Sequence, residues 1–239
     1  MEYLDMLAKL GISGAHPGGF AATLQQFDRY PLPPNSRILE VGCGTGRTAC
    51  YAAARGHEVT GIDLRPDMVA KAKKRAEQEG VTVNFQEGDA CMLPFAEDTF
   101  DVVLVESVSI FTNTPKALAE YRRVLRGGGT LFDREVVRRH PLPPRTNREI
   151  SEFYQVAKLW SVQDWNRLIK DTGFDRTQID GPYPFPKINE DLLNHPDPFQ
   201  LIDDDSLFDE TLWEVIRKYN RIMERYSDDI GFILMIGMK

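Results

Sequence analysis

The chain has 239 residues, of which 42% are hydrophobic and 27% charged, a composition typical of a globular protein built as one domain. Its formal net charge of −7 argues against a broad nucleic-acid-binding surface, which needs a basic stripe. The N-terminus shows no signal peptide, and the longest apolar run, residues 230–238, is too short to cross a bilayer. We therefore expect a cytoplasmic protein without a membrane span.

Two short helices are predicted before the first strand. Apolar residues recur at helical spacing over residues 3–10, and a second helix is predicted over residues 20–30, where prolines end it. The loop between the two helices is rich in glycine and carries His16.

The next stretch, residues 38–46, predicts a strand, a tight loop and the start of a helix. A short apolar run ends in an acid, and three glycines then alternate with other residues: Glu40, Gly42, Gly44 and Gly46. Glycines suit such a loop because they tolerate positive φ and let a ligand approach the bare backbone. The helix that follows presents unpaired N–H groups at its start.

A second strand, predicted over residues 58–62, is followed directly by Asp63. An acid at this place, about twenty residues after a glycine-rich loop, can accept hydrogen bonds from a ribose diol. The two strands and the loop together therefore predict a site for a nucleoside cofactor.

The rest of the chain continues the alternation of strands and helices. Further helices are predicted at residues 45–55, 67–79, 114–125, 151–159, 162–171 and 207–226, and further strands at 82–86, 102–105, 130–137, 173–179 and 231–238. This order predicts an α/β fold with a doubly wound, mostly parallel, seven-stranded sheet. Ligands bind at the carboxyl ends of such strands, and four acids map to that edge: Glu40, Asp63, Asp89 and Glu106.

Three consecutive acids, residues 203–205, invite a metal-site interpretation. Three neighbouring carboxylates cannot all face one ion on a helix, and Asp205 is a good N-cap for the helix predicted after it. We predict no metal site. Residues 182–198 are rich in proline and acids and show no clear period.

The glycine spacing is one residue tighter than the dinucleotide fingerprint. It resembles the first motif of class I S-adenosylmethionine-dependent methyltransferases. Later stretches resemble the small-molecule methyltransferases of ubiquinone and menaquinone biosynthesis: Leu93-Pro94-Phe95, Phe100-Asp101-Val102-Val103 and Leu125-Arg126-Gly127-Gly128-Gly129. The chain has Glu106-Ser107-Val108-Ser109 where nucleic-acid amino-methyltransferases carry Asn/Asp-Pro-Pro-Tyr/Phe, which argues against that class.

The resemblance covers about residues 37–180 and implies a Rossmann-like methyltransferase fold whose last strand is antiparallel. It implies a single domain with an N-terminal helical lid (1–34), a cofactor-binding core (35–180) and a C-terminal helix and closing strand (181–239).

The implied cofactor is S-adenosyl-L-methionine, which becomes S-adenosyl-L-homocysteine. The glycine loop would hold its amino-acid end, Asp63 its ribose and Asp89 its adenine amino group. The predicted cofactor contacts are Glu40, Gly42, Cys43, Gly44, Gly46, Asp63, Leu64, Met68, Asp89, Ala90 and Glu106.

The acceptor side is less defined. The resemblance places His16 near the cofactor's carboxylate or the acceptor; the alternative is a loop histidine in solvent. A general base is needed only if the acceptor must lose a proton, and no base is assigned. The candidates, each more often structural than catalytic, are His16, Glu135, His140 and Tyr154. Aromatic residues that would wall an apolar or cationic acceptor are Phe111, Phe153, Tyr154 and Trp160.

The sequence thus predicts methyl transfer to a small-molecule acceptor, without a nucleic-acid partner, by a monomer or homodimer. Two alternatives stay open. One is an NAD-dependent oxidoreductase, and the other is a regulatory module that keeps the cofactor site without turnover.

Overall fold

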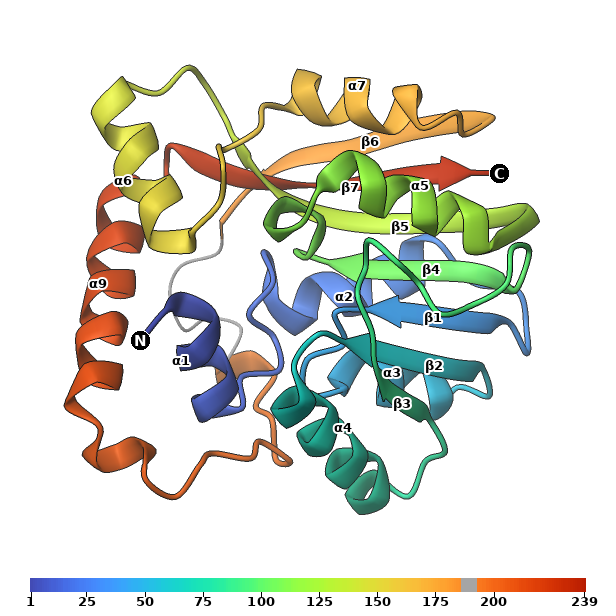
Figure 1. Ribbon diagram of the computed structural model, residues 1–239, viewed down its shortest axis with the longest axis horizontal. Helices are drawn as coiled ribbons and strands as arrows, with labels where there is room; N and C mark the ends of the chain where they lie inside the picture. Colours follow the sequence, from blue (N-terminus) through green and yellow to red (C-terminus); the bar gives the residue numbers. More distant parts are fainter. Residues whose placement is uncertain (186–192) are drawn as a thin grey trace.

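A computed structural model describes residues 1–185 and 193–239. Seven strands form one sheet in the order β3-β2-β1-β4-β5-β7-β6 (Figure 1). The strands are β1 (Arg37–Val41), β2 (Glu58–Asp63), β3 (Asn84–Glu87), β4 (Phe100–Glu106), β5 (Leu125–Arg138), β6 (Arg176–Pro184) and β7 (Ile230–Met238). The first five are parallel, whereas β7 runs antiparallel to both β5 and β6. The predicted sheet and its antiparallel closing strand are confirmed.

Helices cover both faces of the sheet. They are α1 (Tyr3–Leu10), α2 (Gly19–Arg29), α3 (Arg47–Ala53), α4 (Pro66–Glu79), α5 (Thr114–Val124), α6 (Pro144–Tyr154), α7 (Val162–Asp171) and α9 (Glu210–Tyr226), with short 3-10 turns η1 (Ser109–Phe111) and η2 (Ser206–Phe208). Apolar side chains of α2, α3 and α4 pack on one face. Those of α5, α6, α7, α9 and α1 belong to the larger cluster on the other face. The central strands are buried on both faces, as in doubly wound sheets.

The strand order reverses between β1 and β4, because the chain first builds outward to β3 and then returns to β4. Ligand crevices in open α/β sheets lie at this reversal, outside the carboxyl ends of the strands. Helices α1, α6 and α9 lie at that end of the parallel strands (Figure 1). No helix in the described ranges is long and apolar enough to cross a membrane.

Three local predictions are wrong. Helix α6 spans Pro144–Tyr154 rather than residues 151–159, because Pro144 starts it and Gln155, in the left-handed region, ends it. Strand β5 starts at Leu125, which was expected to end the preceding helix, rather than at residue 130, because Leu125 pairs with Phe100.

The third concerns the start of α9. Asp209 caps it by accepting from the Leu212 N–H, whereas Asp205 forms an ion pair with Lys9. Of the proline-rich stretch 182–198, residues 186–192 lie outside the described ranges.

Candidate functional site

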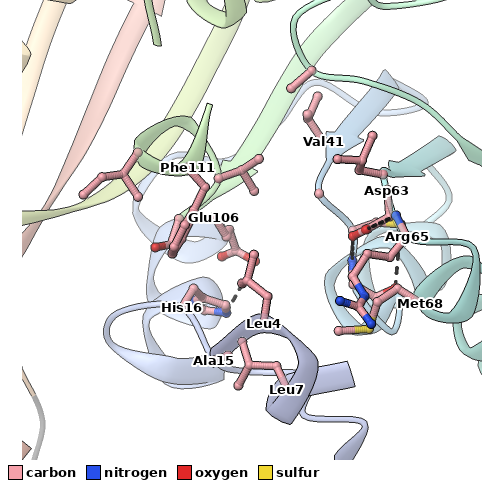
Figure 2. A pocket seen from close by; sticks show the side chains of 18 of the residues that line it. Leu4, Leu7, Ala15, His16, Val41, Asp63, Arg65, Met68, Glu106 and Phe111 are labelled. Carbon is pink, nitrogen blue, oxygen red and sulfur yellow. Dashed lines mark hydrogen bonds and ion pairs between the residues drawn. The ribbon is translucent and has the colours of Figure 1, made fainter. Parts of the chain in front are cut away.

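A cavity of about 290 Å³ opens at the carboxyl ends of β1, β2 and β4. Its wall is formed by the loops that follow these strands, by α1 and the loop after it, and by residues of α6 and α9 (Figure 2). Ten of the eleven predicted cofactor contacts line it: Glu40, Gly42, Cys43, Gly44, Asp63, Leu64, Met68, Asp89, Ala90 and Glu106. The acids that the sequence mapped to one edge are therefore brought together.

The glycine loop needs its glycines for two different reasons. Gly42, Gly44 and Gly46 all have positive φ, at 67°, 54° and 79°. A Cβ at Gly42 would collide with the side chain of Val108, so this glycine lets the loop pass close to the segment after β4. Gly46 does not line the cavity; a Cβ there would press on Phe85 and Ala72. Gly46 thus packs the loop against the core.

Asp63 holds the loop as well as lining the cavity. One carboxylate oxygen accepts from the Gly44 N–H at 2.9 Å and the other from the Arg65 N–H at 2.9 Å. Burial raises the pKa of Asp63, and the two backbone hydrogen bonds oppose that rise. The carboxylate thus ties the tip of β2 to the glycine loop at the cavity edge.

Glu40 is a buried carboxyl at the end of β1, with 4% of its surface exposed. Its carboxyl accepts from the Ala49 N–H, but Oε2 is buried and receives no hydrogen bond within the described residues. Burial, and then the nearby charge of Glu106, raises the pKa of Glu40 well above its ordinary value. A buried acceptor without a donor is costly unless a ligand supplies one. Oε2 therefore fits the ammonium group of a bound ligand.

The far side of the cavity is suited to a flat ring. Leu64 lies on the rim with 72% of its surface exposed, and Met68 is buried beneath it on α4. Asp89 lines the same region and uses one oxygen to accept from the Cys91 N–H at 2.8 Å. An apolar rim beside a carboxylate matches the needs of an adenine ring and its amino group.

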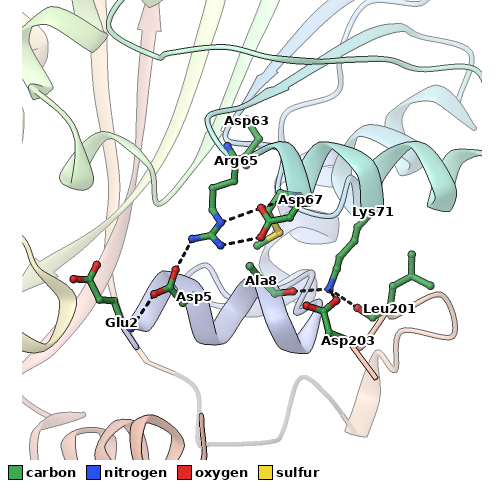
Figure 3. A network of polar contacts seen from close by, with 10 residues as sticks. Glu2, Asp5, Ala8, Asp63, Arg65, Asp67, Lys71, Leu201 and Asp203 are labelled. Carbon is green, nitrogen blue, oxygen red and sulfur yellow. Dashed lines mark hydrogen bonds and ion pairs between the residues drawn. The ribbon is translucent and has the colours of Figure 1, made fainter. Parts of the chain in front are cut away.

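Helix α1 lies over the cavity and is fastened there by ion pairs (Figure 3). Arg65 donates to Asp5 of α1 at 2.7 Å. Lys71 donates to the Ala8 carbonyl at 2.6 Å and pairs with Asp203 at 2.8 Å. These contacts connect α1 to α4 and to the segment before α9.

Glu106 lines the cavity, and groups of the protein surround its carboxylate. Its side chain is 9% exposed and accepts from the hydroxyls of Thr23 at 2.6 Å and Thr48 at 2.8 Å. His16 Nε2 lies 3.4 Å and Arg134 Nε 3.8 Å from the carboxylate. Burial tends to raise the pKa of Glu106, but His16, Arg134 and the two hydroxyls outweigh it and lower the pKa. The carboxylate is therefore ionised inside the protein.

The structure places His16 in the cavity wall rather than in solvent, with 7% of its side chain exposed. Figure 2 shows it paired with Glu106 on the side opposite Asp63 and Met68. Of the other base candidates, Tyr154 also lines the cavity.

The other two base candidates, Glu135 and His140, do not line the cavity. His140 is half-exposed and pairs with Asp229 at 3.0 Å. Glu135 is fully buried behind the wall, where it accepts from the Ile110 N–H at 3.3 Å. Glu135 therefore contacts the wall segment η1.

An aromatic group closes the cavity on the acceptor side. Tyr154 and Phe111 line it as predicted, whereas Phe153 and Trp160 do not. Sequence reasoning missed Tyr3 of α1 and Tyr219 of α9, whose rings lie 6.0 Å apart and stacked. No spacing rule links residues at opposite ends of the chain. Arg65 was also missed, although its place two residues after Asp63 was a usable signal.

Comparisons with known proteins identify the family. A family model described as a methyltransferase domain matches residues 38–129. An uncharacterized methyltransferase of Bacillus subtilis (strain 168), YodH, is 32% identical over 238 residues, which cover 100% of this chain and 99% of that protein. A demethylmenaquinone methyltransferase of Thermus thermophilus is 42% identical over 112 residues, 46% of this chain and 49% of the other.

Solved structures share the fold. The MccD protein superposes with a TM-score of 0.73 at 20% identity, covering 95% of this chain and 99% of that one. Phosphoethanolamine N-methyltransferase 2 of Haemonchus contortus, in complex with S-adenosyl-L-methionine, superposes with a TM-score of 0.78 at 23% identity, covering 99% of this chain and 57% of that one.

Proposed function

Because this chain belongs to the S-adenosylmethionine-dependent methyltransferases, we propose that it transfers a methyl group from S-adenosylmethionine to a small-molecule acceptor. The cofactor supplies a methyl group that its sulfonium makes electrophilic. The protein's part is to bind, to orient and to exclude water, and such positioning can lower a barrier by up to about 7–11 kcal/mol.

The observation that carries the proposal is the orphaned Oε2 of Glu40 beside the glycine loop. The ammonium of the cofactor's amino-acid end would satisfy this oxygen, and Gly42 and Gly44 leave the backbone open to it. Asp63, at the tip of the neighbouring strand, would accept from the ribose. Leu64 and Asp89 would contact the adenine.

The enclosure of the cavity supports a small acceptor. Helix α1 lies over it and is fastened by Arg65 and Lys71. The negative net charge also disfavours a nucleic-acid substrate. A metabolite-sized molecule is the acceptor that such a covered, acidic protein suits best.

Calorimetric titration with S-adenosylhomocysteine tests the cofactor assignment. We expect wild-type protein to bind it and Asp63→Ala to bind about 1–3 kcal/mol more weakly, the cost of removing a hydrogen-bonded carboxylate. Asp98→Ala is the matched control, because Asp98 is exposed and pairs with Lys239 away from the cavity. Tight binding of NADH with none of S-adenosylhomocysteine would contradict the proposal and favour an oxidoreductase. Labelled methyl transfer to a metabolite extract then separates an enzyme from a silent binding module.

A further inference from the structure

The cavity has two unlike sides. The acids and the glycine loop line it around the tips of β1 and β2, whereas the wall beyond β4 is apolar and aromatic. The residues of that second side come from α1, η1, β5, α6 and α9: Tyr3, Leu7, Phe111, Val136, Tyr154 and Tyr219. Because the proposed cofactor takes the first side, the second side is the room left for the acceptor.

The room beyond β4 offers no free partner to an anionic acceptor. Within the described lining of the cavity there is no lysine. Arg65 lies across the cavity (Figure 2) and pairs with Asp5 and Asp67. His16 faces Glu106. A phosphate or carboxylate on the acceptor would be buried without a balancing charge, which is costly.

The tyrosine rings form a wall rather than an open cage for a cation. Tyr3 stands edge-on to Tyr154, with ring centroids 4.8 Å apart at 82°, and stacks on Tyr219, with centroids 6.0 Å apart at 24°. Since the rings cover one another, fewer faces remain for an ammonium group. The three hydroxyls lie near enough to interact electrostatically.

Two of these hydroxyls have no hydrogen-bond partner. Among the described residues, neither the Tyr3 nor the Tyr219 hydroxyl makes a hydrogen bond, and that of Tyr154 donates only to Met223 Sδ, a weak acceptor, at 3.7 Å. Neither unpaired oxygen is sealed in the core, because the buried side-chain atoms that lack a partner include neither of them. A tyrosine hydroxyl in so enclosed a place normally has a partner, and a molecule in the cavity would supply it.

The two unpaired hydroxyls act as donors. Burial raises the pKa of both Tyr3 and Tyr219, so each keeps its proton at neutral pH. A protonated amine has no lone pair to receive such a donor, and a carboxylate brings a charge that nothing on this side balances. An uncharged oxygen, as in a carbonyl, ether or hydroxyl group, meets both conditions.

We propose, on the basis of the function inferred above, that the acceptor is an uncharged, flat and largely apolar molecule that carries an oxygen, and that the hydroxyls of Tyr3 and Tyr219 donate hydrogen bonds to that oxygen. The aromatic wall contacts the rest of the molecule. Tyr3 belongs to α1 and Tyr219 to α9, so the two ends of the chain together select the acceptor. Both tyrosines are specificity residues that position the acceptor.

The test measures binding of four probes that share a naphthalene ring to the full chain saturated with S-adenosylhomocysteine. The probes are naphthol, which has an uncharged oxygen, methylnaphthalene, which has none, naphthoate, an anion, and naphthylmethylamine, a cation at neutral pH. Fluorescence of the ring reports each dissociation constant. We expect naphthol to bind at least about tenfold more tightly than either charged probe, because a buried unpaired charge is costly.

Tyr3→Phe and Tyr219→Phe keep the rings and remove one hydroxyl each. Each should weaken binding of naphthol by about 2–10-fold, the usual worth of one hydrogen bond, and leave binding of methylnaphthalene unchanged. A purely structural role of either tyrosine would move both probes alike. Thermal unfolding and binding of S-adenosylhomocysteine identify the variants that are folded, and each folded variant tests the proposal.

Tyr226→Phe is the matched control. Tyr226 lies on the same helix as Tyr219, but its hydroxyl donates to Glu149 at 2.7 Å and it does not line the cavity. This variant should bind all four probes as wild type does.

Four results would overturn the proposal in protein that binds S-adenosylhomocysteine. They are equal weakening of naphthol and methylnaphthalene in the tyrosine variants, unchanged naphthol binding in both variants, binding of a charged probe as tight as that of naphthol, and binding of none of the four probes. Failure of wild-type protein to bind S-adenosylhomocysteine would instead refute the proposed function.

Discussion

Replacing Glu135 by glutamine should stabilise the protein at neutral pH, although Glu135 is completely buried. Asp133 and Glu135 lie two residues apart on β5, both with no exposed surface. Asp133 Oδ1 and Glu135 Oε2 receive no hydrogen bond from any other described group. The two carboxyls can hydrogen-bond to each other only if one of them carries a proton. Burial accordingly raises the pKa of Asp133 to about 7, and burial together with the Asp133 charge raises the pKa of Glu135 well above its ordinary value.

The magnitude follows from proton linkage. The unfolded chain releases these protons near pH 4, so folding at higher pH takes up at least one proton. A raised folded-state pKa gives stability that is complete below the unfolded pKa and is lost as pH rises toward the folded pKa. The loss is about 1.4 kcal/mol per pH unit for one proton, or about 2–3 kcal/mol between pH 5 and pH 7. Glutamine avoids this cost, because its NH₂ can donate to Asp133 while its carbonyl accepts from the Ile110 N–H.

The assay is urea unfolding followed by circular dichroism at pH 5, 6 and 7. The free energy of unfolding of Glu135→Gln should exceed that of wild type by an amount that grows as pH rises. Near pH 4.5 the two values should be equal. Glu120→Gln is the control with opposite sign, because Arg123 holds the pKa of Glu120 below its usual value. A variant that is less stable than wild type by the same amount at every pH would refute the shared proton.

Two further predictions concern the cavity and the helix over it. Gly42→Ala should weaken S-adenosylhomocysteine binding, measured by calorimetry, by at least about tenfold, or about 1.4 kcal/mol, because the added Cβ collides with Val108 and shifts the loop. Gly80→Ala is the control, because Gly80 has a similar positive φ but open space around it. This variant should bind S-adenosylhomocysteine as wild type does. Lys71→Met should lower the free energy of unfolding by about 1–3 kcal/mol and speed amide exchange in α1, because two carbonyls and Asp203 lose their partner. Lys73→Met, exposed on the same helix, should do neither, and equal effects of the two lysine variants would contradict the role of Lys71.

Much of the fold was predictable because local signals and global fold agree. The glycine spacing and the acids after β1 and β2 fix a loop and an edge, and parallel strands bring such residues together wherever they lie in the chain. Helix α6 starts earlier than predicted, because Pro144 occupies the first helical position, where its missing N–H costs nothing.

The acceptor side was less predictable because it depends on packing between distant elements. Tyr3 and Tyr219 meet only because α1 and α9 pack against each other. Glu106 was expected to contact the cofactor from its place at the tip of β4. Its actual partners come from α2 and α3 and from the loop carrying His16, and no spacing in the sequence links these to a strand end.

The central claim is that Glu40 and the glycine loop bind the amino-acid end of S-adenosylmethionine. Calorimetry with two ligands tests it most directly: S-adenosylhomocysteine, which has that amino-acid end, and 5′-methylthioadenosine, which lacks it. Glu40→Gln should weaken binding of the first by about 1.5–3 kcal/mol, the worth of a hydrogen bond to a charged group, and leave the second unchanged. Equal losses for both ligands, or no loss for S-adenosylhomocysteine, would contradict the account.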